Sequence, residues 1–290
     1  MSSRRTARDW AKPTDPAEPV IDVLLPTSGR IAELAVVLAG LAAQDAPVFR
    51  LIVSDQSDDH AMADAPAVQA MLRVLTAQGR DVRVLQHLPR RGIAEHRAFL
   101  LAQATAPYVL FLDDDVWPEP GLLATLHRAI EDLGCGVVGA AQQGLSYLDD
   151  VRPDEQAPFS AWTDRVEPER LRVDSPGTER WTLHNAANLT HIAAQTELPE
   201  SGWLPYRVAW LAGCVLYRRS ALEAVGGFEF WRDLPENIAG EDVAAQWKVM
   251  ERFGGAGVLP SGAVHLETPT TIPDRSADAA HLLFTTDPVG

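Results

Sequence analysis

The sequence predicts an α/β fold with a mostly parallel central sheet. In the first half of the chain, short apolar runs alternate with amphipathic segments of helical periodicity, the pattern of βαβ units. One run, Tyr108–Leu112, has five consecutive apolar residues, as expected for a strand buried on both faces. Three carboxylates, Asp113, Asp114 and Asp115, follow it directly. Because ligands bind at the carboxyl ends of strands in open α/β sheets, this edge is the predicted functional site.

Each element of the first half follows from a local pattern. The strands are predicted where apolar runs end in turn-forming or acidic residues: Val20–Leu25, Phe49–Val53, Val82–Gln86, Tyr108–Leu112 and Val137–Ala141. The helices are predicted where apolar residues recur at helical spacing: Ile31–Ala43, Ala67–Gln78, Ile93–Ala104 and Gly121–Leu133. Because helical crossovers join successive strands, most of these strands are expected to run parallel.

The periodicity fades between Gly144 and Tyr206, where prolines, acids and tryptophans interrupt one another. A long irregular stretch in a compact protein is usually functional or mobile. The tryptophans in and beside it allow two interpretations, stacking on a sugar or other ring, or packing of the loop onto the core. They are Trp162, Trp181, Trp203 and Trp210.

Regular patterns return in the last third of the chain. The remaining elements are predicted as a strand at Ala209–Tyr217, a short helix capped by Ser220 and ended by Gly226-Gly227, a helix at Asp242–Phe253, and strands at Val258–Leu259 and Ala263–Leu266. The tail after Pro269 is predicted to be weakly structured.

Composition excludes several classes of protein. The net charge of -15 argues against a nucleic-acid binder, which usually presents a basic face. No apolar run reaches the length of a membrane span, and the first residues lack the hydrophobic core of a signal peptide. Cys135 and Cys214 lie in apolar surroundings and are expected to be core residues. We therefore expect a cytoplasmic protein without a membrane span.

The acidic triplet at Asp113–Asp115 allows two interpretations. Carboxylates gathered at the end of a buried strand cost free energy unless a cation or strong donors offset their charge, which favours a binding site. The alternative is a solvated turn that leads into a helix near Pro120, where acids suit the helix dipole.

Five short motifs bear on this choice. They are VLLPTSGR from Val23, IVSDQSDD from Ile52, RRGIAEHRAFLLAQATAPYVLFLDDD from Arg90, GCVLYRRSALEAVGGF from Gly213 and GEDV from Gly240. In this order and at these spacings they resemble the inverting glycosyltransferases of family 2, which have the GT-A fold. The resemblance covers roughly Val20 to Glu267. Ser28, Gly29 and Ala98 depart from the Tyr, Asn and Asn that are usual in that family.

The resemblance implies a nucleotide-diphosphate sugar donor, a divalent cation (Mn²⁺ or Mg²⁺) and inverting transfer to an acceptor hydroxyl. The expected metal ligands are Asp113, Asp115 and His265, and imidazole suits Mn²⁺ better than Mg²⁺. The expected general base is Asp242, with Glu241 orienting it or the acceptor. The expected nucleotide site consists of Pro26, Thr27, Arg30, Asp55, Arg91, Arg97, Asp113 and Asp114.

Simpler roles are open for several of these residues. His265 could be a hydrogen-bonded structural residue, and Asp242 could only cap its helix. Arg91 and Arg97 could lie on a solvated helix face, which suits Arg90 better. A protein that keeps the GT-A fold and binds a nucleotide-sugar or glycan without turnover is the alternative function.

The expected organisation is a Rossmann-like nucleotide-binding half fused to a smaller acceptor-side half. We expect a flexible arm at 1–18, the nucleotide-sugar half at 19–143, the acceptor-binding and catalytic half at 144–268, and a tail at 269–290. The acceptor is expected to be a glycan, a lipid-linked molecule or a small molecule.

Overall fold

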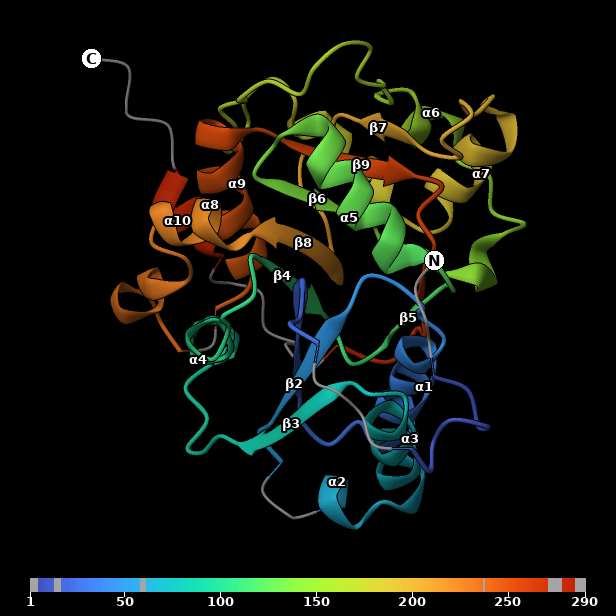
Figure 1. Cartoon of the computed structure of the whole chain (residues 1–290). Coiled ribbons are helices and arrows are strands. Elements are labelled where there is room, and N and C mark those ends of the chain that lie inside the picture. The colour runs from blue at the N-terminus through green and yellow to red at the C-terminus, as the bar shows by residue number, and fades with distance from the viewer. Residues whose placement is uncertain (1–4, 13–16, 58–60, 237, 271–277, 285–290) are drawn as a thin grey trace.

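The computed structural model describes residues 5–12, 17–57, 61–236, 238–270 and 278–284. In these residues eight strands form one sheet in the order β3-β2-β1-β4-β8-β6-β9-β7, and β5 pairs with β10 in a small second sheet (Figure 1). The strands are β1 (Ile21–Thr27), β2 (Phe49–Asp55), β3 (Asp81–Gln86), β4 (Tyr108–Leu112), β5 (Val116–Pro118), β6 (Val137–Gly139), β7 (Leu204–Tyr206), β8 (Cys214–Arg218), β9 (Gly255–Leu259) and β10 (Ala263–His265).

The sheet is parallel in its first half and mixed in its second. Strands β3, β2, β1 and β4 pair in parallel, as do β6 and β9. Strand β8 runs antiparallel to both β4 and β6, and β7 runs antiparallel to β9. The predicted α/β class with a mostly parallel sheet is confirmed, and the inserted β8 is what joins the two halves.

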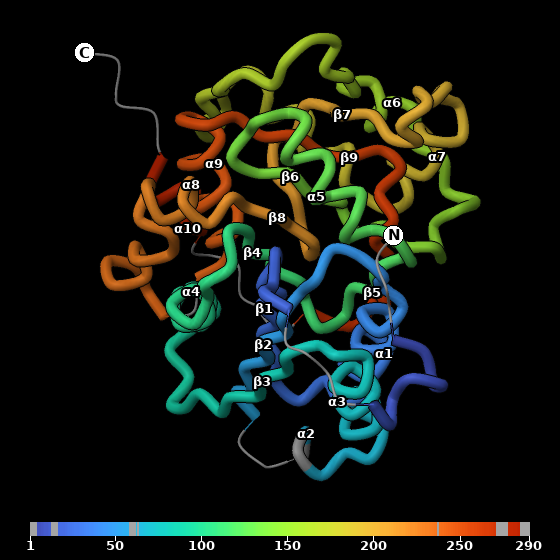
Figure 2. The backbone as a smooth tube through the Cα atoms, viewed as in Figure 1, coloured from blue at the N-terminus to red at the C-terminus, as the bar shows by residue number. Residues whose placement is uncertain are grey.

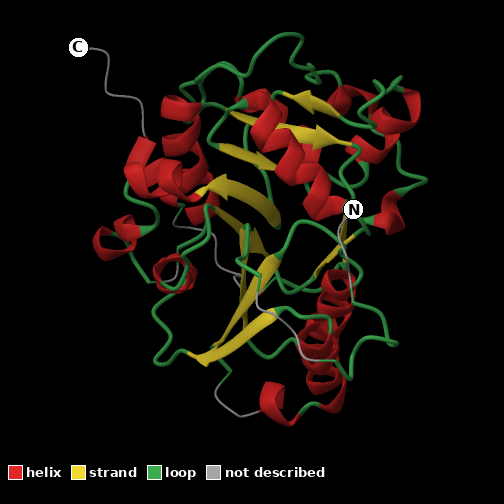
Figure 3. Ribbon diagram, viewed as in Figure 1, coloured by secondary structure: helices red, strands yellow, loops and turns green. Residues whose placement is uncertain are grey.

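Helices cover both faces of the sheet (Figure 3). The α-helices are α1 (Ile31–Ala42), α2 (Ala61–Asp64), α3 (Pro66–Ala77), α4 (Ile93–Ala102), α5 (Leu122–Leu133), α6 (Pro153–Gln156), α7 (Asn188–Gln195), α8 (Arg219–Ala224), α9 (Glu241–Phe253) and α10 (Ala279–Phe284). Short 3-10 helices are η1 (Leu145–Tyr147), η2 (Thr178–His184) and η3 (Glu229–Asp233).

The alternation of side chains along β1 divides the core into two layers. Val23 and Leu25 pack in the cluster that contains residues of α1, α3 and α5, whereas Leu24 packs with residues of α4, α8 and α9. Figure 2 shows α1 and α3 on one side of β1–β3 and α4 on the other. Because both faces are covered, the central strands are continuous apolar runs, which is why periodicity could identify them.

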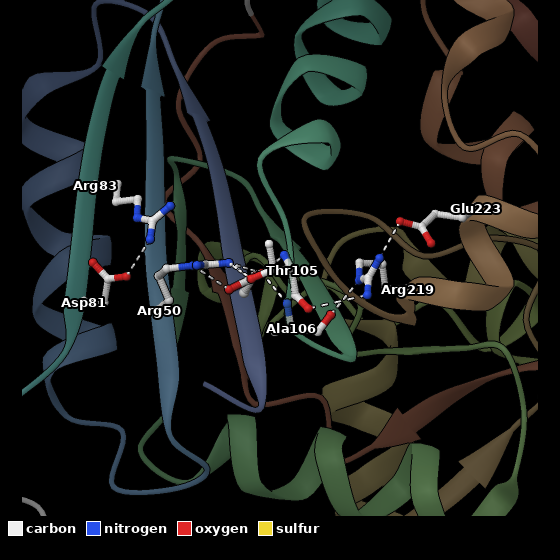
Figure 4. Close-up of polar contacts among 8 residues, drawn as sticks. Arg50, Asp81, Arg83, Thr105, Ala106, Arg219 and Glu223 are labelled. Carbon is white, nitrogen blue, oxygen red and sulfur yellow. Dashed lines mark hydrogen bonds and ion pairs between the residues drawn. The ribbon is translucent and has the colours of Figure 1, made fainter. Parts of the chain in front are cut away.

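A buried ion pair fixes the amino-terminal edge of the sheet. Asp22 is fully buried in β1 and accepts hydrogen bonds from Arg50 Nε (2.8 Å) and Nη2 (2.6 Å). It also accepts the backbone N–H groups of Thr105 (2.7 Å) and Ala106 (2.8 Å), toward which Arg50 points in Figure 4. The buried carboxylate is thus fully partnered, and it ties β1 and β2 to the turn before β4.

Several elements differ from the sequence expectations. The stretch 144–206 contains the eight-residue helix α7, and the tail contains α10, whose Phe284 packs against Trp247 of α9. Burial of one apolar face stabilises these short helices, and their own periodicity is too brief to reveal it. Ser220 lies inside α8 and Arg218 occupies its N-cap position. Within the expected arm and tail, residues 1–4, 13–16, 271–277 and 285–290 lie outside the described residues.

Candidate active site

A cavity of about 870 Å³ opens at the carboxyl edge of the parallel strands. All the predicted site residues except Asp55 and Arg91 line it. They are Pro26, Thr27, Arg30, Arg97, Asp113, Asp114, Asp115, Glu241, Asp242 and His265. The size is that of a ligand site, and side chains from five segments far apart in the sequence converge there.

Strand pairing carries the second half of the chain to the acidic triplet. Leu112 at the end of β4 pairs with Cys214 of β8, and the Asp113 backbone N–H donates to the Gly213 carbonyl at 2.9 Å. On the other side, β5 pairs with β10 so that Val116 lies opposite His265. His265 is thereby placed next to the triplet although 150 residues separate it from Asp115 in the sequence.

Asp114 is the member of the triplet that contacts Thr27. It is buried, and it accepts a hydrogen bond from Thr27 Oγ1 at 2.7 Å and one from Arg30 Nη1 at 3.0 Å. Burial raises the pKa of Asp114 to about 6, because the loss of solvation outweighs these two donors. Asp114 therefore joins the triplet to the end of β1.

Asp115 is the most heavily partnered member. Its Oδ2 accepts from Arg30 Nη1 (2.5 Å) and Thr268 Oγ1 (2.7 Å), and it lies 3.4 Å from His265 Nε2. Burial alone would raise the pKa of Asp115, but the hydrogen bonds of His265 and Thr268 and the charge of Arg30 hold it below its usual value. Asp115 is thus kept ionised in the cavity lining.

The pair Asp115 and His265 suits a divalent cation in part. Two ligands of one ion with bonds of about 2.1 Å lie about 3 Å apart in octahedral geometry, close to the separation seen here. Across the described residues, however, no group of three or more His, Cys, Asp or Glu side chains is arranged to hold a metal. The third predicted ligand, Asp113, instead accepts Arg97 Nη2 at 2.9 Å. Such a site needs oxygens from a ligand or water to complete it, as Mg²⁺ sites with bound phosphates do.

Arg97 connects the acidic triplet to the start of α9. From α4, its Nε donates to Glu241 Oε1 at 2.9 Å and its Nη2 donates to Asp113 Oδ1 at 2.9 Å. Burial would lower the pKa of Arg97, but the charges of Asp113 and Glu241 raise it overall. The guanidinium is therefore a fixed cation between the acidic triplet and the start of α9.

Asp242 lies in the first turn of α9, directly after Gly240 and Glu241. Its Oδ1 accepts the Val243 N–H at 2.8 Å. Burial, followed by the nearby charge of Glu241, raises the pKa of Asp242 to about 7, and the charge of Arg97 only partly opposes this. A carboxylate with a pKa near neutrality at a cavity wall has the property that a general base needs.

The nucleotide side differs in detail from the sequence expectations. Asp55 is buried at the end of β2, where its Oδ1 accepts the Ser57 N–H at 2.8 Å, away from the cavity lining. Its neighbour Gln56 lines the cavity, and its buried Nε2 has no hydrogen-bond partner among the described residues. Arg91 is exposed outside the lining, whereas Arg90 lines the cavity and donates from Nε to the Gln56 carbonyl at 2.7 Å.

The four tryptophans of the irregular stretch divide into two groups. Trp162 and Trp203 are only 8% and 7% exposed and pack in the core. Trp181, at 38% exposure, and the half-buried Trp210 line the cavity and stack with ring centroids 4.7 Å apart. Sequence reasoning singled out all four residues but could not separate these roles, because burial decides between them.

Comparison with known proteins identifies the family. Residues 22–193 match the model of the family described as Glycosyl transferase family 2. This match covers more than half of the 290-residue chain, and the protein belongs to that family. No curated protein matches the chain closely enough to count as a relative.

Solved structures share the fold at low sequence identity. The mannosyltransferase PcManGT from Pyrobaculum calidifontis, in complex with GDP-Man and Mn²⁺, is 18% identical with a TM-score of 0.56 over 92% of this chain and 64% of that one. S. aureus TarS 1-349, in complex with UDP-GlcNAc, is 16% identical with a TM-score of 0.54 over 87% of this chain and 60% of that one. The present chain thus spans about three fifths of their length. These likenesses confirm the expected GT-A fold.

No helix in the described part of the chain is long and apolar enough to cross a membrane.

Proposed function

We propose that this protein transfers a sugar from a nucleotide-diphosphate donor to an acceptor hydroxyl, with inversion at the anomeric carbon. The observation that carries the proposal is the arrangement around Arg97. This buried cation binds Asp113 of the triplet and also Glu241, the residue before Asp242. A potential cation-binding edge and a carboxylate of raised pKa therefore line the same cavity. Inverting transfer needs these two functions on opposite sides of the sugar.

The donor side is assigned to the end of β1, the triplet and β10. Asp115 and His265, with Asp113 if it releases Arg97, would hold a divalent cation, which would neutralise the charge that develops on the leaving diphosphate. Arg30 lies against Asp114 and Asp115, so a phosphate group bound there would also meet its guanidinium. The Mn²⁺ and GDP-Man in PcManGT support this assignment of ligand class.

The acceptor side is assigned to the start of α9. Asp242 accepts the proton of the acceptor hydroxyl as its oxygen attacks the anomeric carbon, and the bond to the diphosphate breaks with its electron pair leaving on the phosphate oxygen. Glu241 accepts a hydrogen bond from Arg97 Nε at 2.9 Å and serves as a positioning residue, because its carboxylate is engaged in that ion pair. One in-line displacement inverts the anomeric configuration.

The division into halves at 19–143 and 144–268 belongs to the same proposal. The first contributes Thr27, Arg30 and the triplet, and the second contributes Asp242 and His265. In this scheme Arg97 and the β4–β8 pairing hold the halves in register.

Nucleotide binding provides the first test. Thermal unfolding and calorimetry are performed with UDP, GDP and TDP, each in Mn²⁺ and in EDTA. One of them in Mn²⁺ should raise the melting temperature by several degrees, because a ligand at about 100 times its Kd adds about 2.7 kcal/mol of stability. Equal affinity in EDTA and Mn²⁺ would contradict metal dependence.

Turnover separates the enzyme from the alternative, a binding protein of the same fold. The assay measures release of the nucleotide diphosphate from the matching nucleotide-sugar. If the protein is an enzyme, the wild-type protein should release it and Asp242→Asn should not. Asp81→Asn is the matched control, since Asp81 lies exposed at the amino end of β3, at the opposite edge of the sheet. Binding of the donor without any release would favour the non-catalytic alternative.

A further inference from the structure

One wall of the cavity contains two stacked tryptophan rings that the proposed chemistry of the donor and the base does not use. Trp181 of η2 and Trp210, just before β8, stack with an interplanar angle of 25° and both line the cavity. Stacking covers one face of each ring, yet Trp181 remains 38% exposed. Its exposed indole surface is available to a ligand in the cavity.

Helix α9 fixes Trp210 relative to Asp242. Trp247 Nε1 donates to the Ala209 carbonyl at 2.8 Å, on one side of Trp210. On the other side, the Gln246 side-chain amide donates to the Leu211 carbonyl and accepts the Leu211 N–H, both at 2.7 Å. The helix that presents Asp242 in its first turn thus holds both backbone neighbours of Trp210, so the ring and the carboxylate keep a constant relation.

The same segment relates the wall to the donor side. Gly213, whose carbonyl accepts the Asp113 N–H, follows Trp210 by three residues, which span at most about 10 Å of extended chain. Trp210 therefore lies within about 10 Å of the glycine that contacts the acidic triplet. An acceptor bound at Trp210 would be close to a donor bound at the triplet.

Aromatic packing supports the wall from behind. His184, in the last turn of η2, lies 6.0 Å from the Trp210 ring and bonds through Nε2 to the Tyr206 hydroxyl at 3.1 Å. Burial lowers the pKa of His184 to about 3, so the imidazole is neutral. Arg180, the neighbour of Trp181, pairs with Glu169 and bonds to the Gly177 carbonyl, which anchors η2. These contacts hold the segment that contains Trp181 in place.

Two residues of the cavity lining have polar atoms without partners among the described residues. The atoms are Gln142 Oε1, an acceptor, and Trp210 Nε1, a donor, and both are buried. Buried polar atoms are nearly always hydrogen-bonded, so an exception at a cavity wall indicates where ligand polar groups would bind. A donor and an acceptor beside aromatic faces match a ligand that carries hydroxyl groups around an apolar ring face.

We propose that Trp181 and Trp210 form an acceptor subsite that binds a pyranose ring, so that the acceptor is a carbohydrate. The inference rests on the proposed transferase function and narrows it. The C–H groups on one face of the sugar stack on an indole face that the contact between the two tryptophans leaves free, because that face carries partial negative charge. The hydroxyl groups at the ring edge reach Gln142 Oε1 and Trp210 Nε1, and one hydroxyl is thereby presented to Asp242.

Indole NMR provides the test. Each of the eight tryptophans gives one Nε1–H signal, which single Trp→Phe variants assign. With Mn²⁺ and a saturating nucleotide diphosphate present, the protein is titrated with methyl α-D-mannopyranoside, methyl β-D-glucopyranoside and methyl N-acetyl-β-D-glucosaminide. Sorbitol, which has hydroxyl groups but no ring face, is the ligand control. At least one pyranoside should shift the Trp181 and Trp210 signals saturably, and sorbitol should not.

Variants of Trp181 measure the contribution of the wall. Trp181→Ala should weaken pyranoside binding about three- to tenfold, and Trp181→Phe should retain part of the affinity because it keeps an aromatic face. Trp10→Ala is the matched control, since Trp10 is similarly exposed at 42% but lies in the N-terminal segment outside the cavity lining. Nucleotide affinity should be the same in all three.

Each other outcome has a definite meaning. No saturable shift with any pyranoside, equal binding of sorbitol, or an equal loss of nucleotide affinity in Trp181→Ala would overturn the acceptor subsite. Nucleotide binding without pyranoside binding refutes this inference and leaves the proposed function standing. Pyranoside binding to a protein that binds no nucleotide diphosphate refutes the proposed function instead.

Discussion

Replacing Asp242 by Asn is expected to stabilise the protein and abolish its activity. Burial raises the pKa of Asp242 to about 7 from an ordinary value of 3.8, so the folded state holds its proton more tightly than the unfolded state does. The stability that this protonation contributes is present in full below pH 3.8 and is lost as the pH rises through 7. Asn resembles the protonated carboxyl and carries no charge at any pH.

The magnitude follows from the difference in pKa. At 1.36 kcal/mol for each pH unit, about three units correspond to about 4 kcal/mol of destabilisation by the ionised carboxylate well above pH 7. The charge of Glu241 contributes to this value and persists in the variant, so we take about 2 to 4 kcal/mol as the expected gain. At about 2–4 °C for each kcal/mol in a protein of this size, the melting temperature should rise by at least about 4 °C.

The assay is urea denaturation of the wild-type protein and Asp242→Asn at pH 8.5 and pH 4.5. The gain should be large at pH 8.5 and much smaller at pH 4.5. Equal gains at the two pH values, or a loss at pH 8.5, would show that the carboxylate is not an unfavourable buried charge. Asp132→Asn, on the exposed last turn of α5, controls for the general effect of removing a negative charge.

Activity should change in the opposite direction. Loss of a general base typically costs about 10²- to 10⁴-fold in rate. Nucleotide affinity should be unchanged, because the proposed mechanism assigns Asp242 to the acceptor side. The wild-type rate should rise with pH through about 7, as the base loses its proton. If Asp242 only caps α9, Asn should serve about as well, and turnover would be near that of the wild type. A product with the donor's anomeric configuration would also refute the mechanism.

Two further predictions concern other carboxylates. Asp115→Asn should destabilise the fold by about 1–3 kcal/mol at pH 7, because Asp115 is ionised and well partnered. The same variant should weaken Mn²⁺-dependent nucleotide binding in calorimetry. A gain in stability would contradict the assigned contacts. Asp22→Ala should cost about 3–5 kcal/mol in urea denaturation, since it leaves Arg50 buried without its partner. Asp81→Ala, at a pair that is half exposed, should cost less than about 1 kcal/mol, and equal losses would refute the role of burial.

Local patterns predicted the longer strands and helices of the first half and the acidic edge, but they did not predict the short elements α2 and β5. The run Tyr108–Leu112 was predicted with the bounds that the structure has, because a strand buried on both faces must be apolar throughout. Periodicity predicted the ends of α1 and α4 to within two residues, because a helix that buries one face repeats its apolar residues at helical spacing. The position of the triplet at the carboxyl edge could be predicted because the triplet directly follows the end of β4 in the sequence.

Tertiary structure alone decided how the site is partnered. The β5–β10 pairing brings His265 to Asp115, and the insertion of β8 beside β4 sets Trp210 near the triplet; pairings over such separations leave no periodic trace in the sequence. Whether a tryptophan packs in the core, as Trp162 does, or faces the cavity, as Trp181 does, depends on burial by segments distant in the chain. The commitment of Arg97 to two carboxylates was likewise invisible, because an arginine on a helix gives the same pattern whether it meets solvent or buried acids.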